Sequence, residues 1–182
     1  MPRLTALVSA AVLAATVALP SVAGAQSLSP DAQARILDRN GETTGTAALT
    51  QGPHGLLITV EMVGLPPGWH AFHIHQVGDC SDPEEGFRAS GSHLGLGEAG
   101  QGLMSPDGPY AGDLPNIHAD EQGRVRVQLF TTFASLTGAK GPGMTVLDED
   151  GAALVVQETP DDHLTGPAGD GGSRLVCGVI SQ

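Results

Sequence analysis

The sequence has few basic side chains. Lysine and arginine together number 8 among 182 residues, against 20 aspartates and glutamates, which gives a formal net charge of −12. This balance excludes nucleic acids and anionic membranes as partners, because their phosphates repel an acidic chain. The charges are scattered, so the sequence predicts neither an acidic tail nor a disordered block, and the negative charge favours solubility and tolerance of cations.

A long apolar run is missing as well. The N-terminal segment "MPRLTALVSAAVLAATVALPSVAGAQS" carries one basic residue, Arg3, and a short apolar stretch that ends in an A-x-A pattern at Ala25. The stretch is short for a membrane span of about 20 residues, and no basic stop-transfer cluster follows it. We therefore expect a signal peptide, 1–25, cleaved after Ala25, and a mature chain, 26–182, that is periplasmic or secreted and not attached to a membrane.

Cysteine is scarce, since Cys80 and Cys177 are the only two. An even number of cysteines in an exported chain predicts a disulfide bond, and two cysteines allow only one pairing. The bond would tie the segment after "HIHQVGD" to the C-terminal strand "RLVCGVI". Two reactive thiols are the alternative, but neither a C-x-x-C spacing nor a neighbouring base supports it.

The mature chain has the length of one domain, and we find no internal repeat or amphipathic helix in it. Glycine is abundant, at 26 of 182 residues, and short segments with two-residue alternation are separated by proline and glycine clusters. This pattern predicts an antiparallel β-sandwich or barrel with two long loops, 77–122 and 159–172, and loops of that length are usually functional. The predicted strands are 33–39, 44–51, 55–63, 69–76, 123–133, 152–158 and 173–180.

Two histidines stand in an apolar strand, in the segment "AFHIHQ". Residues two apart on a strand face the same side, so His73 and His75 converge on one point. Alone, this pair fits a hydrogen-bonded core histidine beside an incidental neighbour as well as it fits a metal site. Further candidates follow, because "GSHLGLGEAGQG" contains His93, "PYAGDLPN" contains Asp113, and a late strand reads "ALVVQETPDD".

Together with "GLPPGWHAFHIHQVGDC", "AGDLPNIHAD" and "SRLVCGVI", these segments resemble the bacterial copper/zinc superoxide dismutases in the same order along nearly the whole mature chain. The resemblance implies an all-β fold, an eight-stranded Greek-key β-barrel of immunoglobulin-like architecture, of which this family is a standard example. It implies superoxide as substrate. It also implies a copper ion held by four histidines, one of which bridges to a zinc ion held by three histidines and an aspartate.

Residue by residue, the implied copper site is incomplete. His73 and His75 match two copper ligands and His93 matches the bridging histidine. Gln157 stands where the resemblance implies the fourth copper histidine, and its amide oxygen is a harder and weaker ligand for copper than an imidazole. Asp161 matches the aspartate that supports both metals from behind their ligands.

The implied zinc site keeps fewer of its ligands than the copper site does. Only His93 and Asp113 remain, because Gln101 and Tyr110 stand at the other two histidine positions. A structural zinc ion takes four protein ligands, and a phenolate at Tyr110 is costly to form at neutral pH. We therefore expect copper as the cofactor, with Asp113 a relic of the zinc site and no bound zinc.

The resemblance also implies two catalytic residues. Arg174 matches the arginine that docks superoxide above copper, and His93 matches the histidine that carries a proton in each cycle. No lysine lies in either long loop, so we expect superoxide to arrive more slowly than in family members that reach the diffusional ceiling. The acidic residues expected around Arg174 are Glu98, Glu158, Asp161, Asp162 and Asp170.

The other histidines receive simpler interpretations. His70 matches a family histidine that braces the barrel, and His54 lies in a "QGPHG" turn where solvent can reach it. His118 and His163 are the remaining candidates to replace the missing copper ligand, and the sequence favours neither.

Several functions stay open at this point. The first is a copper-dependent superoxide dismutase of reduced or lost activity, and the second is non-enzymatic copper binding, buffering or delivery in the periplasm. A hydrolytic zinc ion in the three-histidine site is a third, with no substrate pocket or general base to support it, and a metal-free structural relic is a fourth. The chain could be a monomer or a homodimer.

Overall fold

The computed structural model describes residues 29–97, 100–138, 143–166 and 171–182, so the predicted signal peptide lies outside the described part of the chain. Within that part, no helix is long and apolar enough to cross a membrane. The elements in chain order are β1 (Ala32–Asp38), β2 (Thr43–Gly52), β3 (Gly55–Met62), β4 (Gly68–His70), β5 (Phe72–His75), the 3-10 turn η1 (Arg88–Ser90), β6 (Ile117–Ala119), β7 (Val125–Thr131), β8 (Ala134–Ser135), β9 (Met144–Thr145), β10 (Ala153–Gln157) and β11 (Arg174–Ser181).

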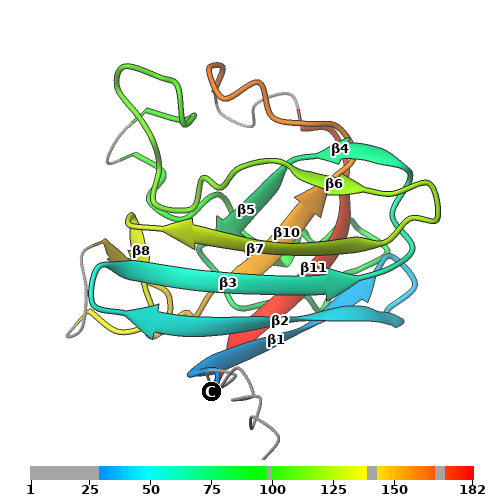
Figure 1. Ribbon diagram of the computed structural model, residues 1–182, viewed down its shortest axis with the longest axis horizontal. Helices are drawn as coiled ribbons and strands as arrows, with labels where there is room; N and C mark the ends of the chain where they lie inside the picture. The colour runs from blue at the N-terminus through cyan, green and yellow to red at the C-terminus, as the bar shows by residue number, and fades with distance from the viewer. Residues whose placement is uncertain (1–28, 98–99, 139–142, 167–170) are drawn as a thin grey trace, which may run out of the picture.

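One curled antiparallel sheet makes up most of the molecule (Figure 1). Its seven strands follow the order β5-β10-β11-β1-β2-β3-β7, and β6 pairs separately with β4. If β4 and β5 count as one interrupted strand, β6 is the eighth strand of the barrel. The links from β3 to β4 and from β7 to β10 join strands that are not neighbours, as in a Greek key. The predicted all-β Greek-key barrel is confirmed.

Some strand boundaries differ from the predictions. The segment 69–76 is two strands, because at Ala71 the chain changes partners: its N–H donates to Thr159 and its carbonyl accepts from the N–H of Gln157, both at 2.9 Å. The predicted loop 77–122 contains η1 and β6. These elements, like β8 and β9, have only two or three residues, too few to show a two-residue alternation in the sequence.

Inward-facing side chains of the curled sheet form the main core. β1 shows the expected alternation, since Ala32, Ala34 and Ile36 are buried and are separated by the exposed Gln33 and Arg35. Burying one large aliphatic side chain contributes about 1.5–3 kcal/mol, so this core is the main source of stability. Its fully buried large members include Ile36, Leu49, Leu56, Ile58, Phe72, Ile74, Leu114, Ile117 and Leu154.

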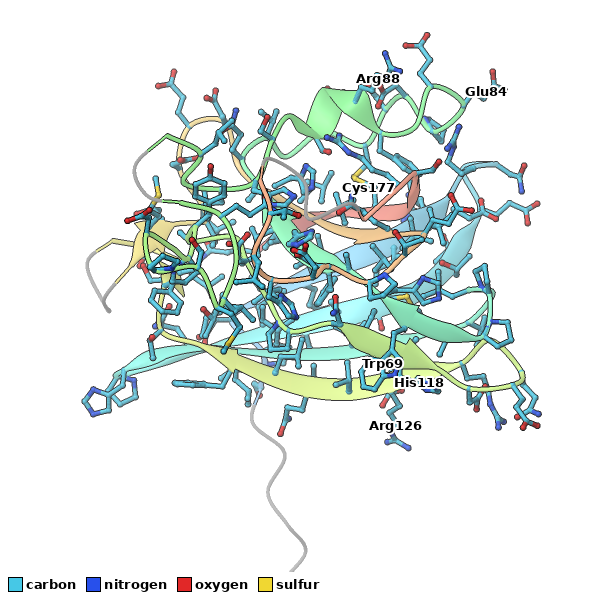
Figure 2. The ribbon with its side chains drawn as sticks, turned by 90° about the horizontal axis from the view of Figure 1, so that it is seen from above. Trp69, Glu84, Arg88, His118, Arg126 and Cys177 are labelled. Carbon is cyan, nitrogen blue, oxygen red and sulfur yellow. A yellow bond between two sulfur atoms is a disulfide. The ribbon has the colours of Figure 1, made fainter. Side chains whose placement is uncertain are left out.

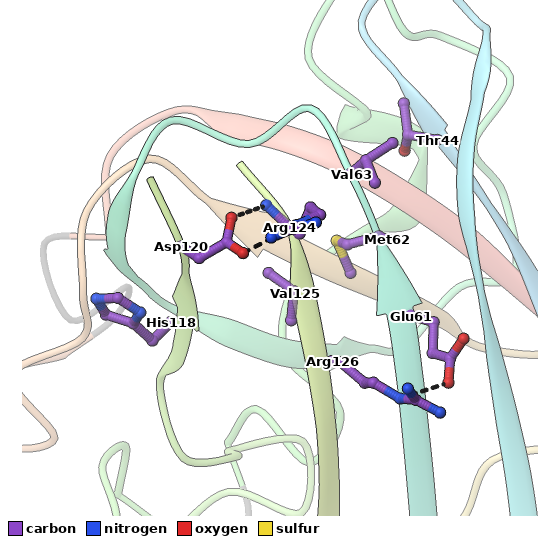
Figure 3. Close-up of a pocket in the computed structure, with 9 residues that line it drawn as sticks. All are labelled: Thr44, Glu61, Met62, Val63, His118, Asp120, Arg124, Val125 and Arg126. Carbon is purple, nitrogen blue, oxygen red and sulfur yellow. Dashed lines mark hydrogen bonds and ion pairs between the residues drawn. The ribbon is translucent and has the colours of Figure 1, made fainter. Parts of the chain in front are cut away.

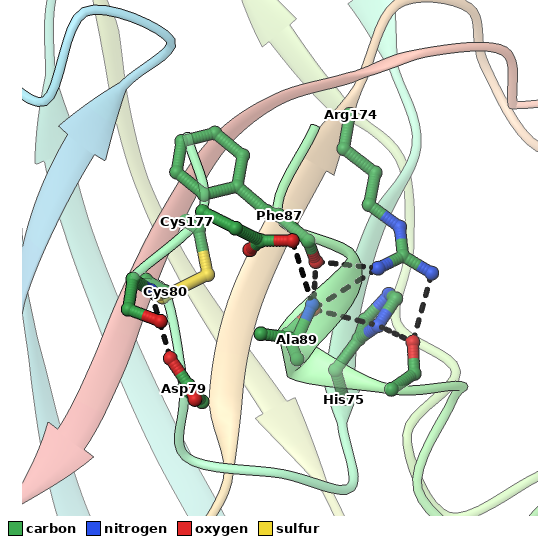
Figure 4. The surroundings of a disulfide bond; sticks show 11 residues. His75, Asp79, Cys80, Phe87, Ala89, Arg174 and Cys177 are labelled. Carbon is green, nitrogen blue, oxygen red and sulfur yellow. Dashed lines mark hydrogen bonds between the residues drawn. A yellow bond between two sulfur atoms is a disulfide. The ribbon is translucent and has the colours of Figure 1, made fainter. Parts of the chain in front are cut away.

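β5 and β10 are buried on both faces. Phe72 and Ile74 point into the main core, whereas a second buried cluster covers the outer face of the sheet: Cys80, Phe87, Ala153, Val155 and Cys177. The predicted Cys80–Cys177 disulfide is present, with an S–S distance of 2.01 Å, and ties the covering loop to β11 (Figure 4). This loop encloses the outer face of β5, which carries the two histidines of "HIH".

Candidate metal centre

Three buried histidines come together on the outer face of β5. His73 and His75 project from alternate positions of the strand, and His93 lies opposite His75 in an isolated β-bridge. The backbone N–H of Leu94 donates to the carbonyl of Ile74 at 2.9 Å, which holds the segment of His93 against the strand. One nitrogen from each of the three rings lies within 4.8 Å of the others, so the predicted trio forms a metal-sized cluster.

Each ring holds one nitrogen in a hydrogen bond to an oxygen that can only accept. The pairs are His73 Nε2 with Asp161 Oδ2 at 2.9 Å, His75 Nδ1 with the carbonyl of Gly91 at 3.0 Å, and His93 Nδ1 with Asp113 Oδ1 at 3.2 Å. A carboxylate or carbonyl cannot donate, so these nitrogens carry the protons. The lone pairs of a neutral trio are therefore on His73 Nδ1, His75 Nε2 and His93 Nε2.

Two of these ligand nitrogens are buried without a protein partner, namely His73 Nδ1 and His75 Nε2. A buried polar atom without a partner is unfavourable by about 1–3 kcal/mol, so a site that leaves two of them side by side suits a ligand that accepts their lone pairs. Imidazole nitrogens suit copper and zinc. The residues present therefore fit a metal ion at this cluster.

The electrostatics keep two rings of the cluster, His73 and His75, in the form that binds metals. Burial lowers the pKa of His75 well below its ordinary value, and the charge of Arg174 lowers it further. Burial also lowers the pKa of His73, although the hydrogen bond to Asp161 opposes that shift. Neutral imidazole is the form that binds metals, so both rings are ready to bind at neutral pH.

Asp161 is held in place as a support for His73. Burial tends to raise the pKa of Asp161, but the hydrogen bonds from His73 and from the backbone N–H of His163 lower it to about 2. Asn116 fixes the backbone of Asp161 from both sides: its Nδ2 donates to the Asp161 carbonyl at 2.8 Å and its Oδ1 accepts from the N–H at 2.9 Å. Sequence reasoning missed Asn116, since a neutral amide that supports a ligand-bearing residue mainly through its backbone leaves no recognisable spacing.

Gln157 ends β10 on the face that carries Val155. Its Nε2 donates to the carbonyl of Gly172 at 3.3 Å, whereas its Oε1 is buried without a partner. Gly171 packs on this amide so closely that a Cβ there would lie 2.6 Å from Oε1. No hydrogen bond among the described residues joins the side chain of Gln157 to the three histidines.

The residues at the predicted zinc positions also come together. Oδ1 of Asp113 is hydrogen-bonded to Nδ1 of His93. Its second oxygen, Oδ2, accepts hydrogen bonds from the backbone N–H groups of Gly102 at 2.7 Å and Tyr110 at 3.0 Å. The ring of Tyr110 lies 6.4 Å from that of His93, edge to face. Both amide atoms of Gln101 are buried without a partner. Only His93 and Asp113 here offer good zinc ligands, and they already bind each other.

Arg174 lies beside the cluster and holds the loop over it. Its Nη1 donates to the carbonyl of Phe87 at 2.6 Å and to Ser90 Oγ at 3.2 Å, and its Nη2 donates to the carbonyl of Gly91 at 2.8 Å (Figure 4). The carbonyl of Gly91 is also the acceptor for His75. Sequence reasoning missed this carbonyl, because backbone groups have no sequence signature.

Basic residues near Arg174 are more numerous than expected. Arg39 and Arg88 join Arg174 in lining a surface pocket of about 390 Å³. Arg39 is distant in the sequence, and only the fold brings its guanidinium to the covering loop. Of the predicted acidic surroundings, Glu158 and Asp162 are exposed, Asp161 is buried, and Glu98 and Asp170 lie outside the described residues.

Neither spare histidine joins the trio. His118 packs edge-on against Trp69 at 5.0 Å, on the opposite side of the molecule from Arg88 (Figure 2). It lines a separate pocket of about 680 Å³ over β3, β6 and β7, whose walls contain none of the trio (Figure 3). His163 is held at Nε2 by Asn116, 3.2 Å away. His70 is buried, and its ring nitrogens face the carbonyls of Pro66 and Gln157, in keeping with a bracing role.

A curled β-barrel with three converging, buried imidazoles on its outer face is the arrangement of a β-barrel protein with a candidate metal site. The chain belongs to the copper/zinc superoxide dismutase family, because the family model described as copper/zinc superoxide dismutase (SODC) matches residues 43–180. It is 42% identical over 142 residues to a Cu-Zn superoxide dismutase of Caulobacter vibrioides, covering 78% of this chain and 80% of that protein.

Other relatives extend this likeness. Over 148 residues the chain is 34% identical to the superoxide dismutase-like protein YojM of Bacillus subtilis, covering 80% of this chain and 74% of that one. The crystal structure of a superoxide dismutase-like protein from Bacillus subtilis superposes with a TM-score of 0.73 at 33% identity, covering 81% and 96% of the two chains. The Cu/Zn superoxide dismutase from Brucella abortus superposes with a TM-score of 0.64 at 26% sequence identity, covering 83% of this chain and 100% of that one.

Proposed function

We propose that this protein is an exported copper protein that dismutes superoxide at a three-histidine site, without zinc and at a reduced rate. The observation that carries the proposal is the buried trio, in which each ring has one nitrogen held by an acceptor and the other available. Copper would be held by His73 Nδ1, His75 Nε2 and His93 Nε2. When bound, it would supply the one-electron oxidation and reduction that dismutation of superoxide requires.

Arg174 would bring the superoxide anion to this site. Its guanidinium is partly exposed, and three hydrogen bonds to the covering loop fix its direction. Because Arg174 and His75 share the carbonyl of Gly91, the docking cation and a metal ligand keep a constant spacing. Such preorganisation removes the need to order the site when the substrate arrives.

Two features support a reduced rate. Gln157 stands where the family supplies a fourth imidazole, so one copper ligand is replaced by a weaker donor. The chain also carries a formal net charge of −12, and this field repels an anionic substrate. Arg39, Arg88 and Arg174, which line a pocket together with Glu85, offset the repulsion only locally.

The absence of zinc is supported by the donor set. Asp113 already accepts three hydrogen bonds, and Gln101 and Tyr110 are poor zinc ligands at neutral pH. Export is supported by the A-x-A pattern that ends at Ala25 and by the disulfide, since disulfides persist in oxidising compartments.

Non-enzymatic copper binding is the second candidate. It is favoured by one observation, the replacement of the fourth ligand by Gln157, because a site that binds copper without supporting both oxidation states equally would store the metal rather than cycle it. Both candidates require the same trio. They differ only in whether superoxide is consumed.

Metal analysis of protein purified from its own periplasm, run beside a superoxide assay, tests the proposal. We expect about one copper per chain, no stoichiometric zinc, a mature N-terminus at Gln26, and a rate below that of an intact family enzyme. His75→Gln should abolish copper binding and activity, whereas the matched change His118→Gln should alter neither. Full copper with no activity would establish the second candidate, and one zinc beside full copper would refute the zinc-free site.

A further inference from the structure

Asp113 is buried and fully engaged, although it stands at a position where the family resemblance implies a zinc ligand. Its side chain is 1% exposed, and both carboxylate oxygens accept hydrogen bonds. Oδ2 accepts two backbone N–H groups, from Gly102 and Tyr110, and Oδ1 faces Nδ1 of His93 at 3.2 Å. The two backbone donors fix the plane of the carboxylate, so Oδ1 has one direction in which to point.

The backbone keeps Asp113 and His93 together by itself. The N–H of Ile74 donates to the carbonyl of Gly112 at 2.8 Å, and the N–H of Gly112 donates to Leu94 at 2.9 Å. Gly112 has no room for a side chain, because a Cβ would lie 2.1 Å from the carbonyl oxygen of Ile74. Residues 112 and 113 are therefore locked between β5 and the segment that carries His93.

We propose that Asp113 is a positioning residue that does in this protein what a neighbouring metal ion would do elsewhere: it selects the tautomer of His93. By accepting the proton of Nδ1, the carboxylate leaves the lone pair on Nε2, which is the nitrogen available to the trio. The inference rests on the copper site proposed above. It assigns Asp113 a present role rather than the relic status that the sequence predicts.

The count of donors and acceptors supports this role. Three N–H groups meet one carboxylate, which has lone pairs for all of them. If His93 carried its proton on Nε2 instead, Nδ1 and Oδ1 would face each other as two acceptors in a buried place, which is strongly unfavourable. The opposite tautomer would also place a hydrogen where the trio needs a lone pair.

The first test needs no variant. Ring ¹⁵N chemical shifts of the metal-free protein at neutral pH report which nitrogen of each histidine carries the proton. We expect the Nδ1–H form for His93. Observation of the Nε2–H form would overturn the proposal, whatever metal the protein binds.

The second test is Asp113→Asn. An asparagine has one oxygen for three donors, so if that oxygen stays with the backbone N–H groups, its NH₂ faces His93 and moves the ring proton to Nε2. We expect that tautomer shift and a 10- to 100-fold loss of copper affinity, about the size usual for removing a group that orients a metal-binding histidine. Asp161→Asn should change the tautomer of His73 and leave that of His93 unchanged. Asp107→Asn, at an exposed position in the same loop as Asp113, should change neither tautomer.

The outcomes separate this inference from the proposed function. Failure of wild-type protein to bind copper would refute the proposed function, while the tautomer, measured without metal, still tests Asp113. Copper binding by wild type together with unchanged tautomer and affinity in Asp113→Asn would refute the positioning role alone. Stoichiometric zinc that is lost in Asp113→Asn would also refute it, because Asp113 would then be a metal ligand.

Discussion

His75 and Arg174 donate hydrogen bonds to the same oxygen, the carbonyl of Gly91, at 3.0 and 2.8 Å. One residue is a metal ligand candidate on β5, and the other is the cation expected to dock superoxide at the start of β11. The shared acceptor belongs to the loop that the disulfide anchors. The position of the loop, the orientation of the His75 ring and the direction of the Arg174 guanidinium are therefore mechanically connected.

Replacing Arg174 by lysine should lower activity while copper binding stays nearly intact. Lysine keeps the charge, but it has no planar fork to reach Phe87 and Gly91 together, so the cation loses its fixed direction. We expect about a 10- to 100-fold loss in kcat/KM, in the range by which a focused cation changes the arrival of an anion. Superoxide consumption at several ionic strengths, with copper content measured in parallel, checks this. Arg126→Lys, far out on β7, is the control, and equal losses in both variants would contradict the prediction.

Removing the disulfide with the double change Cys80→Ser and Cys177→Ser should destabilise the fold. The bond joins residues 97 apart in the sequence, and closing so long a loop is worth about 4.7 kcal/mol in the chain-entropy model. Urea unfolding of the metal-free variant measures the loss. Copper should also dissociate faster, because the loop that holds the Gly91 carbonyl is no longer anchored. Unchanged unfolding curves for this variant, or for wild type under strong reductant, would argue against the bond.

The metal-free protein should lose stability as the pH falls from neutral. Burial lowers the pKa of both His73 and His75, so at acidic pH the unfolded chain binds more protons than the folded chain does. Their contribution is therefore fully present above about pH 6.5, the ordinary pKa of histidine, and is lost as the pH falls through that value toward the lower folded-state pKa. Each group adds a slope of up to about 1.4 kcal/mol per pH unit.

Urea unfolding of metal-free protein between about pH 5 and pH 8 measures this slope. His75→Gln removes one of the two groups and should flatten it, whereas His54→Gln, in an exposed turn, should leave it unchanged. A pH-independent free energy of unfolding in wild type would show that neither ring is kept neutral by burial.

The fold was predictable where the hydrophobic pattern of the sequence is periodic. Alternation along β1 and β3 predicts their inward faces, and two residues of spacing suffice to place His73 beside His75. Two cysteines can form only one intramolecular disulfide bond. These inferences hold because each depends on residues that lie close in sequence or on a count.

The rest depends on contacts that no local pattern encodes. Ala71 breaks a strand because its partners change from β6 to the end of β10, and that exchange exists only in the assembled barrel. Arg39 reaches the covering loop from the turn that follows β1, 44 residues before its acceptor Pro83. Gly91 acts through its carbonyl, so its side chain gives no signal. The active role proposed for Asp113 also requires knowing which atoms face it.

The change Gln157→His should raise dismutase activity more than any other single substitution. It restores a fourth imidazole at the end of β10, opposite the strand of His73 and His75, where the family provides one. The amide of Gln157 is only weakly held, with one 3.3 Å hydrogen bond to Gly172 and an Oε1 that has no partner, so its removal sacrifices little.

Copper-loaded Gln157→His should show a higher rate and tighter copper, measured by superoxide consumption and by competition with a chelator. Gln157→Asn is the matched control: it keeps an amide, offers no imidazole and should not gain activity. Adding Glu158→Lys should help further by attracting superoxide, and that second gain should shrink as salt rises, since screening acts within about 10 Å at 0.1 M. The gain should remain capped, because we expect no zinc beside His93. If wild type already matches an intact family enzyme, or if Gln157→His leaves the copper-loaded rate unchanged, the missing imidazole is not what limits this site.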